Sequence, residues 1–196
     1  MKKIFTILLL FAFSFANYVF ASEADDFIRK YENAQLADFE LVHDLDPYQV
    51  EDYYKYAWAP YPLFRTSIDL YFKSIHIVPG YYILTPRTIK DKDYVFFKQN
   101  GKVVHIIPVA DKDFVTELFY HEVLPEPKRN LFGKIYVKTR RNFYRIFRKG
   151  KKQDPPNAYI EASTIDNLFF RIDVYYGTTC YSLFFKKMKD YETPQQ

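Results

Sequence analysis

The chain has 196 residues, 20% of them aromatic, 27% charged and only five of them glycine, and its formal net charge at pH 7 is +4. This composition excludes a disordered or low-complexity polymer, and the many aromatic residues favour a folded domain that contains β-strands. A single cysteine excludes an intramolecular disulfide, so the fold must depend on its hydrophobic core.

The N-terminus has the pattern of a cleaved secretory signal peptide. Two lysines precede a nearly unbroken apolar run over residues 4–16, and small side chains follow up to Ala21. We therefore expect a cleaved signal over residues 1–21 and a single globular α+β domain over residues 22–196. The expected location is periplasmic or extracellular, and bacterial, because export without disulfides suits a bacterial envelope. A retained membrane anchor is the alternative, although the run is short for a spanning helix of about 20 residues.

Two helices are expected at the start of the mature chain. Residues 23–37 place apolar side chains at helical spacing behind an acidic first turn. Asp46 is a good N-cap and Pro47 suits the first helical position, so a second helix is expected over residues 48–58. Two prolines beyond this range end the second helix.

Strand-like patterns replace the helical period from about Leu63 onward. Residues 68–78, 81–85 and 132–138 each predict one strand, and residues 111–124 predict a short helix.

The clearest local signal is Asn100-Gly101, the preferred pair for a type I′ hairpin turn, between two apolar runs over residues 94–109. A two-residue loop predicts that Phe97 faces Val104 and that Phe96 faces His105. Both faces of this hairpin are apolar, so we expect it to be a covered, central part of a sheet.

Residues 168–187 predict a second hairpin with Gly177-Thr178 as its loop, one face apolar and the other mixed and wetter. Taken together, the elements predict an α+β fold. N-terminal helices are followed by a mostly antiparallel sheet with one or two additional helices packed on it.

Motifs that carry catalytic chemistry are missing from the sequence. The four histidines lack metal-ligand spacing, Cys180 has no obvious activating neighbour, and no phosphate-binding glycine loop is present. We therefore predict no catalytic residue, no metal site and no cofactor. The alternative is an enzyme of an unrecognised type, which would use a tyrosine-lined pocket with His105 or His121.

Residues 58–64, with the sequence WAPYPLF, place Trp58 and Tyr61 between prolines. Such residues can form a rigid aromatic ledge on which a sugar stacks. The competing interpretation is that the same two rings pack the end of the preceding helix onto the sheet.

The basic segment, residues 138–152, has the sequence KTRRNFYRIFRKGKK, with eight basic residues and no acid. A helix over residues 140–149 would be amphipathic, with phenylalanines on one side and bases on the other. The candidate binding residues are Arg141, Arg145, Arg148, Lys149, Lys151 and Lys152.

Three interpretations of the basic segment compete. In the first, its bases are solvated or pair with acids of the N-terminal region, residues 22–69, which contains eleven acids and four bases. Alternatively they bind an anionic cell-wall polymer or a lipid surface. Nucleic acid is not expected, because export removes the protein from it.

We expect an exported protein, non-enzymatic rather than catalytic, that binds an anionic partner through this segment. A structural subunit or protein–protein interaction module is a further alternative, and the oligomeric state stays open.

Overall fold

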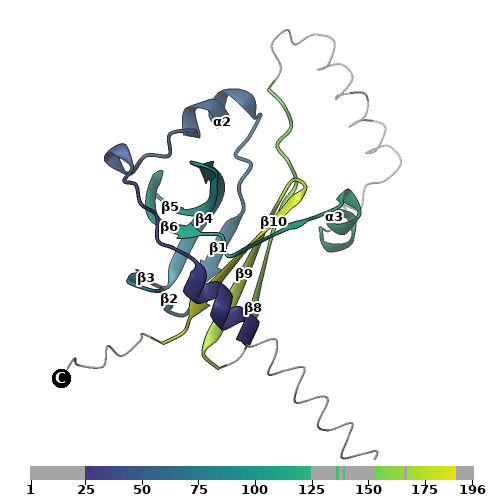
Figure 1. Ribbon diagram of the computed structural model, residues 1–196. Coiled ribbons are helices and arrows are strands. Elements are labelled where there is room, and N and C mark those ends of the chain that lie inside the picture. Colours follow the sequence, from purple (N-terminus) through teal and green to yellow (C-terminus); the bar gives the residue numbers. More distant parts are fainter. Residues whose placement is uncertain (1–24, 125–135, 137–138, 140–151, 166, 189–196) are drawn as a thin grey trace, which may run out of the picture.

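The computed structural model describes residues 25–124, 136, 139, 152–165 and 167–188 (Figure 1). This described part is α+β and confirms the expected class. Two antiparallel sheets lie against each other, and short helices lie outside them. The expected signal peptide, residues 1–21, lies outside the described residues. No helix in the described part of the chain is both long and apolar enough to cross a membrane.

The first sheet contains the predicted Asn100-Gly101 hairpin and has the strand order β1-β4-β5-β6. Val95, Phe96 and Phe97 of β5 are fully buried between the neighbouring strands and the layers on both sides, as expected for a central strand. The strands are β1 (Leu63–Thr66), β4 (Gly80–Ile89), β5 (Lys92–Gln99) and β6 (Lys102–Pro108).

The predicted register of the β5–β6 hairpin is wrong beyond its first pairs. Phe97 lies opposite His105 rather than Val104, and Phe96 lies opposite Ile106, because the register shifts between Phe97 and Lys98. Such a bulge places one extra residue on one strand, and two apolar faces give no signal that would locate it.

The second sheet contains the other predicted hairpin and has the order β3-β2-β10-β9-β8, with β7 also pairing with β10. Thr179 lies opposite Tyr176, so the Gly177-Thr178 loop and its register are confirmed. The strands are β2 (Leu70–Phe72), β3 (Ile75–Ile77), β7 (Asp111–Phe114), β8 (Ala158–Thr164), β9 (Phe169–Tyr176) and β10 (Thr179–Lys186).

Two element predictions need correction. Residues 68–78 form the β2–β3 hairpin instead of one strand, because Lys73 adopts a left-handed φ of 51° and turns the chain. The predicted helix over 111–124 begins later, since residues 111–114 form β7 on the edge of β10 and only α3 (Glu117–Val123) is helical. Of the strand predicted over 132–138, only Tyr136 is described, and it is helical.

The main core lies between the two sheets, where the rings of Phe97 and Phe185 are 6.1 Å apart. The expected wet face of the β9–β10 hairpin is in fact mostly buried, with Arg171, Tyr175 and Lys186 half-buried. Phe27 of helix 25–33 packs on Phe184 of this face, with ring centroids 5.0 Å apart. The buried Asp173 is satisfied there, because Ser182 Oγ and Arg171 Nε donate to its Oδ1 at 2.5 and 2.8 Å.

Both N-terminal helices end earlier than predicted. The described part of the first covers residues 25–33, and the second is α2 (Gln49–Lys55), preceded by the 3₁₀ turn η1 (Val42–Asp44). Asp46 acts close to its predicted capping role, since its Oδ1 accepts a hydrogen bond from the Tyr48 N–H at 3.0 Å.

Candidate functional site

The outer face of the first sheet, turned away from the second sheet, carries two cations. Side chains alternate along a strand, and the β4–β5 pairing puts Arg87 and Lys98 on the same face as Thr85. The side chains of Arg87 and Lys98 are only 10% and 8% exposed. Buried cations need carboxylate partners. Here α2 and the residues just before it supply them.

Asp46 and Asp52 are those partners. Arg87 Nε donates to both carboxylate oxygens of Asp46 at 3.0 Å, and Lys98 Nζ donates to Asp46 Oδ2. Arg87 Nη2 also donates to Asp52 Oδ2, and the Tyr61 hydroxyl donates a hydrogen bond to the same oxygen at an O–O distance of 2.6 Å. Two cations and two carboxylates make this latch, composed of Asp46, Asp52, Tyr61, Arg87 and Lys98, electrically neutral.

The pKa shifts in the latch follow from burial and charge. Burial opposes ionisation of Asp46, but hydrogen bonds from Arg87 and Lys98 hold its pKa below the ordinary value. Burial lowers the pKa of Lys98, and the bond to Asp46 only partly opposes this. Burial and the neighbouring Asp52 raise the pKa of Tyr61, which keeps its hydroxyl protonated as a donor.

A cavity of about 320 Å³ lies beside the latch. Its walls come from α2, the segment 56–61 and the ends of β4 and β5. This volume lies at the lower end of the range of about 300–1,000 Å³ for small-molecule sites. The aromatic lining consists of Tyr53, Tyr56, Trp58 and Tyr61, and the polar lining consists of Gln49, Asp52, Thr85, Lys98 and Lys152.

Thr85 is the unusual polar residue of this lining. Its side chain is fully buried, and its Oγ1 has no hydrogen-bond partner among the described residues. Lys98 lies diagonally across the β4–β5 pair from Thr85, since Ile83 faces Lys98 and Thr85 faces Phe96. The lining of the cavity therefore includes a fully buried hydroxyl without a partner and, diagonally across the strand pair, a buried ammonium group.

Trp58 and Tyr61, the predicted ledge residues, line the same cavity but differ in exposure. Trp58 is 60% exposed, so it does not pack the end of the helix onto the sheet. Tyr61 does pack, because its ring stacks on Tyr176 at 5.4 Å. Binding of a sugar at this pair stays a prediction.

The C-terminal end of the basic segment reaches the cavity. Lys152 Nζ donates to the Tyr53 carbonyl oxygen at 2.5 Å and lies 4.0 Å from the centre of the Tyr53 ring. The backbone of the next residue, Gln153, bonds the end of α2 and the chain just beyond it. Its N–H donates to Lys55 O at 2.7 Å, and its carbonyl oxygen accepts a hydrogen bond from the Ala57 N–H at 2.9 Å. The remaining candidates lie outside the described residues: Arg141, Arg145, Arg148, Lys149 and Lys151.

His105 and His121 are not part of the cavity. His105 is half-buried on β6, where burial and the nearby His76 hold its pKa below the usual value. It lines a separate groove of about 520 Å³ whose lining includes Glu40 and Asp44. His121 is exposed on α3. Neither histidine lines the cavity beside the latch, and an enzyme that uses one of them stays a prediction.

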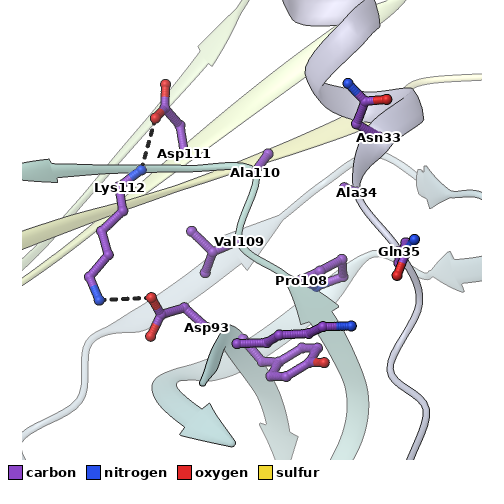
Figure 2. A pocket seen from close by; sticks show the side chains of 11 residues that line it. Asn33, Ala34, Gln35, Asp93, Pro108, Val109, Ala110, Asp111 and Lys112 are labelled. Carbon is purple, nitrogen blue, oxygen red and sulfur yellow. Dashed lines mark hydrogen bonds and ion pairs between the residues drawn. The ribbon is translucent and has the colours of Figure 1, made fainter. Parts of the chain in front are cut away.

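A further groove, of about 530 Å³, lies where helix 25–33 ends beside β5 and β7 (Figure 2). Three of its four charged lining residues, Asp93, Asp111 and Lys112, form ion pairs within the chain. Lys112 Nζ lies 2.7 Å from Asp93 Oδ2, and Lys30 Nζ lies 2.6 Å from Asp111 Oδ2. These pairs neutralise most of the charge in the groove.

Comparison with protein-family models, curated proteins and solved structures found no match to this chain. Among the described residues, no group of three or more His, Cys, Asp or Glu side chains is arranged to hold a metal ion. The geometry of the cavity and the charge of the basic segment are therefore the basis for assigning a function.

Proposed function

We propose that this protein is an exported, non-enzymatic binding protein, and that its basic segment binds an anionic envelope polymer. The observation that carries the proposal is the position of Lys152. This last base of the segment lines a cavity together with the exposed ring of Trp58. A polymer held along the segment therefore has a cavity at its end.

The charge of Lys152 supports this function because no nearby carboxylate cancels it among the described contacts. Its partners are a carbonyl oxygen and an aromatic ring, both of Tyr53. Asp46 and Asp52, the acids of the latch, already bond Arg87 and Lys98. These two members of the acidic N-terminal region are thus committed to the sheet and not to the basic segment.

A polymer suits the surroundings better than a lipid surface does. Glu51 is exposed on α2, and the sequence over residues 22–69 has a large excess of acids. A flat anionic bilayer would bring its headgroups against these acids as well as the bases. A single polymer chain can follow the bases and avoid the acids.

The test is cosedimentation with polygalacturonate, an acidic sugar polymer, at rising salt. We expect wild type to bind, with an affinity that falls as salt screens the charges. Each base contributes about 1 kcal/mol at an anionic surface, so Arg141, Arg145 and Arg148→Ala together should weaken binding about a hundredfold at low salt. The matched control replaces exposed bases elsewhere, Arg29, Arg65 and Lys92, and should bind nearly as wild type does.

Equal binding by wild type and the Arg141, Arg145, Arg148 variant would overturn the proposal, as would a lack of binding by both. Vesicles of phosphatidylglycerol provide the comparison with a lipid surface. Binding to vesicles without binding to polygalacturonate would assign the segment to a membrane instead.

A further inference from the structure

We infer that the cavity holds one sugar ring, which stacks on Trp58 and hydrogen-bonds Thr85 Oγ1 and Lys98 Nζ through its hydroxyl groups. This inference deepens the proposed function and rests on it, and it adds that the polymer is a glycan. It assigns the ring-binding residues, which differ from the bases of the basic segment.

The unused hydroxyl of Thr85 is the first reason. Most buried polar side chains of the described chain have partners, including those of Asp46, Thr66, Lys98, Asp173 and Ser182. Thr85 Oγ1 has none, and Thr85 belongs to the lining of a cavity, whereas the other unpaired buried hydroxyl of the described chain, that of Tyr120, lies in the hydrophobic cluster that includes Val115 and Cys180. A buried polar group without a partner is rare in folded proteins and is explained here by a ligand.

Lys98 supplies a second donor at the same place. An ammonium group has three N–H donors, and one of them bonds Asp46 Oδ2. Because Lys98 also lines the cavity, a further N–H can serve a ligand oxygen. Thr85 can both donate and accept, so the two residues match a pair of adjacent hydroxyl groups.

Because the latch is electrically neutral, the part of the ligand that binds beside Lys98 should be uncharged. A ligand carboxylate beside Lys98 would also meet Asp46 and Asp52, whose charges already balance Lys98 and Arg87. A neutral hydroxyl avoids this repulsion. An acidic substituent of the same ring is better placed at the mouth, where Lys152 lies.

The mouth of the cavity supplies the stacking surface. Trp58 is 60% exposed and Tyr53 is 70% exposed, and both line the cavity. A ring with one apolar face and hydroxyl groups around its edge therefore satisfies the aromatic mouth and the polar floor together.

Nuclear magnetic resonance titration with digalacturonic acid and with its neutral dimethyl ester tests the inference. Thr85→Val removes the hydroxyl and keeps the shape, so the affinity for both probes should fall about three- to tenfold. Stability should stay the same or rise, since no internal hydrogen bond is lost. Trp58→Ala should lower the affinity about tenfold without unfolding the protein, because the ring is exposed.

Two matched controls separate the cavity from general effects. Thr66→Val makes the same change at a buried hydroxyl that bonds Ile68 O at 2.7 Å, so it should lower stability and leave saccharide binding unchanged. Tyr54→Ala removes a ring that is 71% exposed and does not line the cavity, in contrast to its neighbour Tyr53. Tyr53→Ala should weaken binding, and Tyr54→Ala should not.

The outcomes distinguish this inference from the proposed function. If Thr85→Val and Trp58→Ala bind both probes as wild type does, the cavity is not the ring site and the inference is wrong. If polygalacturonate binding is also unaffected by loss of Arg141, Arg145 and Arg148, the proposed function fails as well. Loss in the cavity variants alone would keep the ring site and reject the basic segment.

Discussion

Arg87 donates hydrogen bonds to both carboxylate oxygens of Asp46, a residue 41 positions earlier in the chain. Asp46 is 3% exposed and also bonds Lys98, so one carboxylate joins β4 and β5 to the segment that leads into α2. Asp46 therefore fixes α2, which forms one wall of the cavity, to the strands β4 and β5, which form its floor. The stability of the cavity therefore depends on Asp46.

Asp46→Asn should be strongly destabilising. It removes the negative charge that balances Arg87 and Lys98 and leaves buried cations with less compensation, at a cost of about 3–5 kcal/mol. Urea unfolding followed by circular dichroism measures the loss. Asp44→Asn is the control, since Asp44 is exposed and its replacement should change stability by less than about 0.5 kcal/mol. Similar stabilities of the two variants would contradict the role of the latch.

The same carboxylate gives stability a dependence on acid pH. The pKa of Asp46 is lower in the fold than the ordinary 3.8, because the hydrogen bonds from Arg87 and Lys98 outweigh the opposing effect of burial. Its contribution is therefore complete above the unfolded value and is lost as pH falls through the folded value. We expect the free energy of unfolding to drop as pH falls below about 4, more steeply in wild type than in Asp46→Asn. Equal slopes in urea titrations would show that Asp46 is not linked to folding.

Cys180 should be unreactive in the folded protein. It is 4% exposed, and burial together with the charge of Asp173 raises the pKa of its thiol to about 12. At pH 8 the thiolate is scarce and inaccessible, so a thiol reagent should label the chain only in denaturant. Cys180→Ser gives the blank, because the sequence has no other cysteine. Rapid labelling without denaturant would show that β10 opens at this position.

The anchoring of the basic segment predicts a backbone effect at Gln153. Its N–H bonds Lys55 O at 2.7 Å, and its carbonyl oxygen accepts the Ala57 N–H at 2.9 Å. Gln153→Pro removes the donor and should expose the Ala57 amide to hydrogen exchange, whereas Gln153→Ala keeps both bonds and the protection. Exchange measured residue by residue by nuclear magnetic resonance decides this. Continued protection of Ala57 in the proline variant would mean that the segment is held elsewhere.

The parts of the fold that local chemistry determines could be predicted from the sequence. The β9–β10 register follows from a two-residue loop at Gly177-Thr178, and the β5–β6 turn follows from Asn100-Gly101. The turn at Lys73 could not be predicted, because a lysine with positive φ has no sequence signal. The burial of the mixed face of the β9–β10 hairpin depends on helix 25–33, whose Phe27 packs on Phe184 and lies far from it in the sequence.

The candidate site was predictable only in its aromatic and basic residues. Trp58, Tyr61 and Lys152 attract attention by residue type, and the structure brings them to one cavity. Thr85 and Lys98 acquire their role from the pairing of β4 with β5 and from the approach of α2, which no local pattern encodes. A lysine directly after the apolar run "VFF" was the available signal for Lys98, since a cation at a buried strand position requires a partner.

The exposed ring at the mouth of the cavity also has an optical consequence. Trp58 is the chain's single tryptophan. Its indole is 60% exposed, so its emission in the unliganded protein should be that of a ring in contact with water. A molecule that covers the ring should shift this emission to shorter wavelength. The protein therefore carries an intrinsic fluorescent reporter of this cavity, and a collection of candidate ligands can be screened without any label.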